Sequence, residues 1–242
     1  MLNSVEIKRS AREVGFDDCG VARADALTDR EYPLREWLRR GWQGNLTYME
    51  RNVDMRLNPR LLVPGAQTVI CCVSTYPPPD NVGGTAAYAR TRDYHKDVKQ
   101  MLFALCEKLC IEGKCCCDTV PISEKHWAAR AGLGWIGRNT LLVTPRWGSW
   151  VNLGEVVTTE KCDLYDAPFE ASPCAACGRC IEACPNQALA HDGQPMLDAR
   201  RCTACYTTHH PHPLPEGVDS CGYTLGCDLC QLACPCNQVL EK

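Results

Sequence analysis

The sequence has little of several features that mark common classes of protein. No apolar run approaches the roughly 20 residues that a membrane-spanning helix needs. The segment from Met1 to Asp18 is amphipathic and lacks the continuous apolar stretch of a secretory signal. The net charge is only −3, so an RNA partner would require a local basic face. These absences predict a cytoplasmic protein without a membrane partner.

Cysteine, by contrast, is abundant, with 20 in 242 residues. Disulfides persist mainly in oxidising compartments, so this many cysteines in a cytosolic chain indicate a metal site. Twelve of the 20 cysteines lie from Cys162 onward. The other eight, among them the pair at 71–72 and the triplet at 115–117, occur in strand-like apolar runs. There we expect them to pack as small hydrophobic residues.

Two cysteine runs have the spacing of iron–sulfur ligands. They are Cys174-x2-Cys177-x2-Cys180-x3-Cys184-Pro185 and Cys227-x2-Cys230-x3-Cys234-Pro235. In two-cluster bacterial ferredoxins the fourth cysteine of such a run binds the other cluster. The second run lacks the first cysteine of the pattern, and Cys202, which lies between the runs, can supply it. The spacing therefore predicts two [4Fe–4S] clusters.

Exchange of the fourth ligand between the runs predicts two sets of four thiolates. Cluster 1 is expected on Cys174, Cys177, Cys180 and Cys234. Cluster 2 is expected on Cys184, Cys202, Cys227 and Cys230. Two alternatives stay open, because paired Cys-x2-Cys motifs also bind zinc and cysteines in an oxidising compartment form disulfides. Zinc is less favoured because each run carries a further cysteine that proline follows, and disulfides are less favoured because no secretory signal is visible.

Helices and strands alternate over residues 1–160, which predicts an α/β (α+β) layer architecture. Apolar residues at helical spacing predict helices at 4–16, 31–40, 96–111 and 124–131. Short apolar or β-branched runs predict strands at 19–22, 68–74, 115–120, 140–143 and 150–158. The shift to cysteine-rich, loop-rich sequence near Lys161 predicts an α/β domain at 1–160 and a small ferredoxin-like domain at 161–242.

Three other motifs carry weaker functional interpretations. The glycines at 132, 134 and 137 match the letters of a dinucleotide fingerprint, but they follow an expected helix where that motif needs a strand. The pair Asp93-x-His95 begins like the cobalt-ligating Asp-x-His-x-x-Gly motif, but Val98 stands where glycine is required, which favours a surface or capping role. Prolines surround a group of histidines that we interpret as exposed loop residues: His209, His210 and His212.

Asp118 follows the apolar run at 115–117. A carboxylate at the end of a strand can be desolvated, and it then has the raised pKa that a general acid needs. A turn or N-cap role explains such a residue equally simply, and the residue alone favours that role. Both interpretations stay open at this point.

Motifs in the same order along nearly the whole chain resemble the epoxyqueuosine reductase family. They are Met55-Arg56, Leu62-x-Pro64-Gly65, Tyr88-Ala-Arg90-x-Arg92-Asp-Tyr94-His95-Lys96, Asp118-Thr-Val-Pro121-x-x-Glu124, Ala131-Gly-Leu-Gly-Trp-Ile-Gly137-Arg-Asn139, Gly148-Ser149, Leu153-Gly154-Glu155, the first cysteine run, Leu197-Asp-Ala-Arg-Arg-Cys202 and Gly226-Cys-Asp-x-Cys230-Gln-Leu-x-Cys234-Pro235. Each motif is modest by itself, whereas the ordered set is specific.

This resemblance implies a cobalamin-dependent reductase with two [4Fe–4S] clusters, which converts epoxyqueuosine in tRNA to queuosine. It implies a cobalamin-binding α/β domain, with the cofactor base-off, packed against a ferredoxin-like domain. The family residue that matches Asp118 is viewed as the proton donor to the departing epoxide oxygen. The implied cobalamin-binding positions are Arg56, Asp118, Leu142, Leu153 and Arg138. The implied partners are tRNA carrying epoxyqueuosine and an electron donor such as flavodoxin or ferredoxin.

Three features depart from the family pattern. Residues 204–209 replace a Ser-Tyr-Leu-Thr-Ile-Glu-like segment, Cys236 replaces a tryptophan, and the sequence ends eight residues after Cys234, where longer members continue into a helical-repeat region. These differences leave two alternatives: a corrinoid iron–sulfur reductase with another substrate, and a ferredoxin-type electron-transfer protein. Asp118 distinguishes the second alternative, because an electron carrier needs no proton donor.

Overall fold

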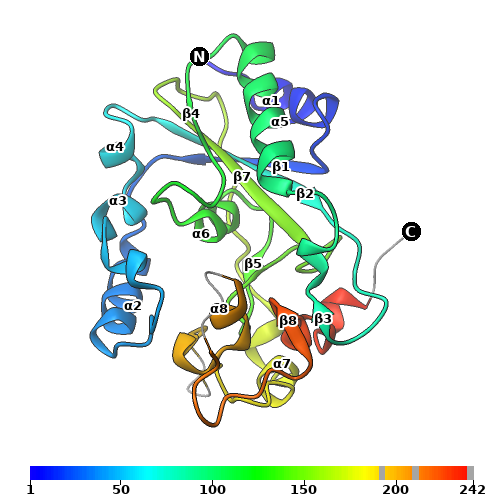
Figure 1. Ribbon diagram of the computed structural model, residues 1–242. Coiled ribbons are helices and arrows are strands. Elements are labelled where there is room, and N and C mark those ends of the chain that lie inside the picture. Colours follow the sequence, from blue (N-terminus) through cyan, green and yellow to red (C-terminus); the bar gives the residue numbers. More distant parts are fainter. Residues whose placement is uncertain (191–193, 209–212, 239–242) are drawn as a thin grey trace.

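The computed structural model describes residues 1–190, 194–208 and 213–238, so the three histidines at 209, 210 and 212 lie outside the described residues. A four-stranded antiparallel sheet in the order β1-β2-β7-β4 forms its centre (Figure 1). The strands are β1 (Asp18–Arg23), β2 (Thr68–Thr75), β7 (Val151–Thr158) and β4 (Lys114–Cys116). The mixed α/β architecture that the sequence predicts is confirmed.

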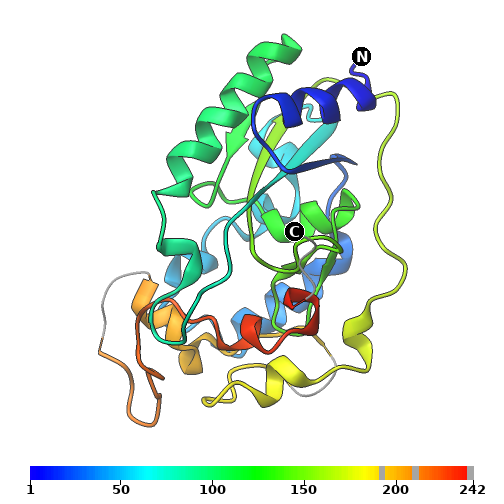
Figure 2. The same ribbon diagram turned by 90° about the vertical axis from the view of Figure 1, so that its right-hand side faces the viewer.

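Helices cover both faces of this sheet. They are α1 (Ser4–Glu13) and α5 (Tyr94–Leu109) on one face and α6 (Glu124–Arg130) on the other (Figures 1 and 2). Side chains of β2 alternate between the faces, as strand geometry requires. Ile70 and Cys72 pack with α1 and α5, whereas Cys71 and Val73 pack with α6.

The cysteines outside the two runs pack largely as expected. Cys71, Cys72, Cys116 and Cys117 are fully buried, in agreement with the behaviour of cysteine as a small hydrophobic residue. The predicted strand at 115–120 is shorter than expected and ends at Cys116. It ends because the chain turns sharply two residues later, where Asp118 has a left-handed backbone with a φ of 56°.

Six further elements complete the described part of the α/β region. They are α2 (Thr28–Arg39), α3 (Val53–Leu57), α4 (Pro59–Leu62), β3 (Gly84–Thr85), β5 (Trp135–Ile136) and β6 (Leu142–Val143). Helix α2 begins three residues before its predicted start at position 31. No helix among the described residues has the combination of length and hydropathy that a bilayer span requires.

The cysteine-rich region, residues 173–238 without the two undescribed segments, is built from short elements. They are α7 (Arg179–Glu182), α8 (Thr203–Thr208), β8 (Tyr223–Leu225) and α9 (Leu229–Leu232). In both views it lies below the sheet, in yellow to red (Figures 1 and 2). Strand β8 pairs in parallel with β3, which joins this region to the segment between β2 and α5.

Buried polar contacts fasten the cysteine-rich region to the rest of the chain. The fully buried Asp228 accepts a hydrogen bond from the Ala87 backbone N–H at 2.8 Å. Asn237 accepts a hydrogen bond from the Ser149 backbone N–H at 2.6 Å, and the Ser149 hydroxyl donates to Gln231 at 2.9 Å. Because buried polar groups are costly without partners, these contacts fix how the two parts dock.

Candidate active site

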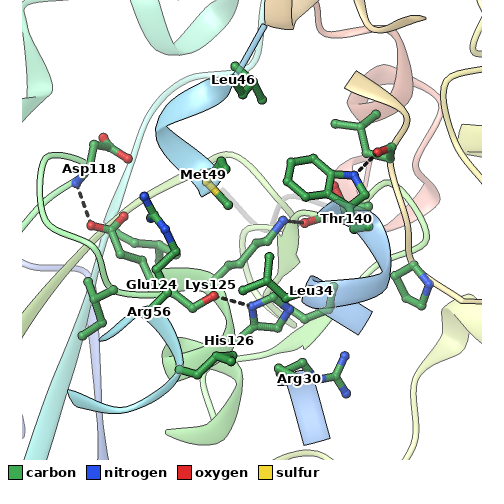
Figure 3. Close-up of a pocket in the computed structure, with 18 of the residues that line it drawn as sticks. Arg30, Leu34, Leu46, Met49, Arg56, Asp118, Glu124, Lys125, His126 and Thr140 are labelled. Atoms are coloured by element: carbon green, nitrogen blue, oxygen red, sulfur yellow. Dashed lines mark hydrogen bonds between the residues drawn. The ribbon is translucent and has the colours of Figure 1, made fainter. Parts of the chain in front are cut away.

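A cavity of about 500 Å³ opens beside α2, the loop after β4 and the start of β7 (Figure 3). Apolar side chains from α2, the segment 46–49 and β7 form much of its wall: Leu34, Trp37, Leu46, Met49, Val151 and Leu153. A few polar side chains also line it: Arg56, Asp118, Glu124, Lys125 and His126. An apolar cavity with a few placed polar groups is the usual form of a cofactor or substrate site.

Asp118 stands at the rim of this cavity with its carboxyl group held by two neighbours. The Tyr94 hydroxyl donates to Oδ2 at 2.5 Å, and His95 Nε2 lies 3.1 Å from the same oxygen. Burial and the adjacent Asp118 raise the pKa of Tyr94, so the phenol stays a hydrogen-bond donor. The Asp118 side chain is 45% exposed. The carboxyl group is therefore only partly desolvated, and the turn that the sequence offered as an alternative is present at this residue.

Two carboxyl groups near Asp118 are more deeply buried, one in the cavity wall and one in the sheet. Glu124, in the first turn of α6, accepts a hydrogen bond from the Asp118 backbone N–H at 2.6 Å (Figure 3). Burial, and then the charge of Asp118, raises the pKa of Glu124 to about 8. Glu155 on β7 is fully buried, and burial raises its pKa well above the ordinary value. Its position between Leu153 and Val157, which share its face of the strand, is the sequence signal that could have revealed a buried acid.

Lys125 and His126 also enter the cavity wall, and sequence reasoning overlooked both. Lys125 Nζ donates to the Thr140 carbonyl oxygen at 2.6 Å (Figure 3), and burial lowers its pKa to about 8. The Ser123 hydroxyl lies 2.8 Å from His126 Nδ1. Burial lowers the pKa of His126 to about 3, so its imidazole is neutral at physiological pH. The sequence around these two residues has no metal-ligand spacing that would mark them.

Arg56 on α3 projects into the cavity (Figure 3). Its Nη2 donates to the Tyr48 carbonyl oxygen at 3.1 Å. Its buried Nε has no hydrogen-bond partner among the described residues, and burial lowers the pKa of the guanidinium. A buried hydrogen-bond donor without an acceptor is rare in native proteins. It marks a place where a bound group can accept a hydrogen bond.

A second cavity, of about 330 Å³, adjoins the first. It contains all four cysteines predicted for cluster 2: Cys184, Cys202, Cys227 and Cys230. Leu142 lines only this second cavity. Five residues line both cavities and form the partition between them: Lys125, Thr140, Val151, Leu153 and Leu197.

A third and smaller cavity, of about 30 Å³, contains the four cysteines predicted for cluster 1: Cys174, Cys177, Cys180 and Cys234. Trp135 Nε1 donates to Cys174 Sγ at 3.3 Å, and Arg138 Nη1 donates to the Cys177 carbonyl oxygen at 3.0 Å. Asn139 lines both this cavity and the second one. The three cavities therefore lie in series.

In the second and third cavities the cysteines line the walls and do not converge on one point. Among the described residues, no group of three or more His, Cys, Asp or Glu side chains is arranged around a single metal ion. A cubane cluster differs in that it is held by thiolates around its outside. Two further cysteines border the cavities, Cys205 at the second and Cys236 at the third, so the substitutions noted in the sequence fall beside the predicted clusters.

The structure brings together some of the predicted cobalamin-binding residues and separates others. Arg56, Asp118 and Leu153 line the large cavity. Leu142 lines the adjoining second cavity, and Arg138 lines the third, against the cysteines predicted for cluster 1.

The two weaker motifs inside the described residues have structural explanations. Asp93 is the N-cap of α5 and accepts from the His95 backbone N–H at 3.1 Å, so the capping role is confirmed. The glycine motif at 132–137 directly follows α6 and enters β5, which is not the strand–turn–helix context of a dinucleotide site.

Paired cysteine-lined cavities beside an acid-bearing cofactor cavity define an iron–sulfur oxidoreductase. Family comparisons agree: residues 56–119 match the model of epoxyqueuosine reductase QueG, DUF1730, and residues 173–237 match that of the 4Fe-4S double cluster binding domain. The epoxyqueuosine reductase of Gloeobacter violaceus is 37% identical over 253 residues, which cover 99% of this chain and 77% of the relative. The chain therefore belongs to the epoxyqueuosine reductase family.

Solved structures support the same assignment. An epoxyqueuosine reductase crystallised with an epoxyqueuosine-modified tRNA-Tyr stem loop has a TM-score of 0.88 and 29% identity, covering 98% of this chain and 66% of that one. A Bacillus subtilis epoxyqueuosine reductase, whose aspartate-bearing catalytic loop is described as swung out of the active site, has a TM-score of 0.87 and 27% identity over 98% of this chain.

These comparisons confirm the predicted family, the fold class and the oxidoreductase class. The family uses two [4Fe–4S] clusters and cobalamin, as the sequence predicts.

Proposed function

We propose that this chain reduces the epoxide of epoxyqueuosine in tRNA to the alkene of queuosine. One observation carries the proposal: Asp118 lies in the wall of a cofactor-sized cavity that shares five lining residues with the cavity of the cluster 2 cysteines. A proton donor, a cofactor cavity and an electron-transfer centre are thus adjacent. The similar reductase crystallised with a modified tRNA stem loop supports tRNA as the substrate. A flavodoxin or ferredoxin is the proposed external electron donor.

The residues of the large cavity fit cobalamin. The unpaired Nε of Arg56 can donate to one of its amide groups, and apolar side chains such as Trp37 and Leu153 can pack against a macrocycle. We propose that Arg56, Asp118 and Leu153 hold the cofactor in its base-off form, with Leu142 supporting it from the second cavity. When bound, cobalamin supplies a metal centre that transfers electrons to the epoxide.

Each predicted set of cysteines is proposed to bind one [4Fe–4S] cluster. The match to a double-cluster domain at residues 173–237 supports two clusters, and the grouping of each set of four thiols in its own cavity supports this ligand assignment. Arg138 then stabilises the backbone around cluster 1 through the Cys177 carbonyl. We also propose the division into an α/β domain at 1–160 and a ferredoxin-like domain at 161–242.

Asp118 is proposed as the acid that protonates the departing oxygen. Removing an epoxide oxygen as water consumes two electrons and two protons and leaves a carbon–carbon double bond. An oxygen that leaves protonated has a lower barrier than one that leaves as an anion, which is the contribution of a positioned general acid. The hydrogen bond from Tyr94 and the contact with His95 orient the carboxyl group for this step.

The test is anaerobic reconstitution with iron, sulfide and cobalamin, followed by mass spectrometry of the nucleosides from epoxyqueuosine-containing tRNA. We expect queuosine to appear only when a reductant is supplied. Reconstituted protein that holds both clusters and cobalamin but forms no queuosine would contradict the proposed substrate.

A further inference from the structure

The proposed reaction requires more protons than Asp118 alone can supply. Each epoxide consumes two protons when its oxygen leaves as water, and a carboxylic acid supplies one. Bulk solvent is a poor immediate source once cofactor and substrate cover the cavity. A second proton-holding group in contact with Asp118 would meet this need.

Glu124 occupies that position. It lines the same cavity as Asp118, and its Oε1 accepts the Asp118 backbone N–H at 2.6 Å (Figure 3). The side chain extends from the first turn of α6, whose backbone is anchored over the sheet by the fully buried Trp127 and Ala128. The anchored helix holds the Glu124 carboxyl group beside the loop that carries Asp118.

Glu155 lies deeper in the protein behind the same group. Its position on β7 pairs with Cys71 of β2 on one side and Cys116 of β4 on the other. Its side chain is fully buried, and neither carboxyl oxygen has a hydrogen-bond partner among the described residues. An ionised carboxylate in such a place would be strongly destabilising, whereas a carboxylic acid is tolerated. Glu155 is therefore neutral in the folded protein.

The groups that face Glu124 also favour its protonated form. Once Asp118 has given up its proton, its carboxylate presents a like charge, and Glu155 would present another if it ionised. The thiols of Cys116 and Cys117 have raised pKa values because they are buried, so they stay neutral. Lys99 opposes these effects, but its Nζ is engaged by the Thr119 hydroxyl at 3.1 Å. The hydrogen bond from the Asp118 backbone N–H also favours the carboxylate of Glu124. Burial and the charge of the Asp118 side chain outweigh this bond and Lys99, and they raise the pKa of Glu124 to about 8.

We propose that Glu124 is a proton reserve for Asp118. Glu155, which is buried and neutral, offers no positive charge that would stabilise the carboxylate form of Glu124, and so it helps Glu124 to keep its proton. This inference rests on the proposed function. Asp118 gives its proton to the epoxide oxygen as the carbon–oxygen bond breaks. Glu124 passes its own proton to Asp118, which delivers it as the oxygen leaves as water. The external electron donor supplies the two electrons, and solvent later reprotonates both carboxylates.

The first experiment looks for the proton itself and needs no turnover. Infrared spectroscopy detects the carbonyl band of a protonated carboxylic acid. We expect such a band in the holoprotein at pH 7, and we expect one component to disappear as the pH rises through about 8. That component should be missing in Glu124→Gln, which keeps an oxygen acceptor for the Asp118 N–H, and unchanged in the control Glu107→Gln, because Glu107 is exposed on α5.

The second experiment measures the pH dependence of turnover. Glu124 is protonated below its pKa, so wild-type turnover should be steady below pH 8 and fall above about pH 8. In Glu124→Gln we expect turnover to fall roughly 10-fold to 100-fold and this alkaline decline to disappear. Lys125 also loses its proton near pH 8. The variant Lys125→Arg stays charged, so it should retain the decline if Glu124 causes it.

The outcomes separate this inference from the proposed function. A wild-type spectrum without the titrating acid band, or a band that survives in Glu124→Gln, would overturn the proton reserve whatever the substrate is. Loss of the alkaline decline in Lys125→Arg would assign it to Lys125 and also overturn the inference. If Glu124→Gln does not fold, the band in wild type and its response to Glu155→Gln, which should shift it, decide the question. Absence of any queuosine with wild type counts against the function alone.

Discussion

The two parts of this protein obtain their order in different ways. In the α/β part, the four strands of the sheet bury apolar side chains on both faces, in two large clusters with α6 on one side and α1 and α5 on the other. In the described part of the cysteine-rich region the helices are only four to six residues long. One small buried cluster joins Cys180, Ile181 and Leu189, and another of the same size is shared with Leu46 of the α/β part. Helices this short are not stable by themselves. The first part is held by its hydrophobic core, whereas we propose that the second depends on the metal clusters that its cysteines would bind.

Removing one cluster ligand should have the largest effect, and it should disturb the cysteine-rich region but not the sheet. Cys230→Ala should cost about four of roughly eight irons, because one [4Fe–4S] cluster loses a thiolate. Hydrogen exchange should then accelerate across α8 and α9 and stay slow in β2 and β7. The measurements are iron analysis and hydrogen-exchange mass spectrometry.

Cys205→Ala is the matched control for that experiment. Cys205 borders the same cavity but is not among the proposed ligands. We expect it to keep both clusters and the wild-type exchange pattern. Loss of a cluster in Cys205→Ala, or retention in Cys230→Ala, would refute the ligand assignment.

A change in the α/β part should separate chemistry from cofactor binding. We expect Asp118→Asn to retain both clusters and bound cobalamin but to lose turnover by a factor of about 10² to 10⁴, because the leaving oxygen loses its general acid. The measurements are metal analysis, the corrinoid absorption spectrum and queuosine formation. Asp80→Asn, in an exposed loop, serves as the control. Near-normal turnover in Asp118→Asn would remove this residue from the mechanism.

A substitution at the contact between the two parts should have a smaller effect, on the free energy with which they dock. Asn237→Ala removes the acceptor for the Ser149 N–H and the donor to the Gln231 carbonyl at 2.7 Å. Leaving these buried groups unpaired should cost about 1–3 kcal/mol of docking free energy. Exchange should increase in residues 229–238 and near Ser149. Gln238→Ala changes an exposed neighbouring amide and should have no effect, and equal exchange in both variants would show that the contact does not couple the two parts.

His126 provides the smallest expected change. Its ring lines the large cavity, but Nδ1 contacts the Ser123 hydroxyl at 2.8 Å. We expect the electron paramagnetic resonance spectrum of cobalt(II)-loaded protein to lack splitting from a protein imidazole nitrogen, in wild type and in His126→Ala alike. A splitting that disappears in the variant would make His126 an axial ligand and contradict the proposed binding mode.

Local patterns predicted much of this architecture. Strand β2 appears in the sequence as a short buried apolar run, and helix α5 as a repeat of apolar residues at helical spacing, because both signals arise from neighbours along the chain. The grouping of the eight cysteines by cavity also follows their spacing. These features depend on short-range geometry, which a sequence displays directly.

Features that depend on how distant segments meet were missed. Glu155 is buried because β7 lies between β2 and β4, an order that no local pattern contains. Arg138 follows a glycine-rich bend that turns towards Cys177, so it lies beside the cysteines predicted for cluster 1 instead of lining the large cavity. The acid at Asp118 was identified from the family resemblance, whereas its exposure and its two neighbours, Tyr94 and His95, required the fold.

Anomalous diffraction from anaerobic crystals of the loaded protein tests the central claim most directly. Data collected at the iron and cobalt absorption edges locate each metal separately. The account predicts one iron centre beside Cys180, a second beside Cys230, and cobalt in the large cavity next to Asp118, with the second iron centre between the other two. Cobalt outside that cavity, or only one iron centre in fully loaded protein, would contradict it.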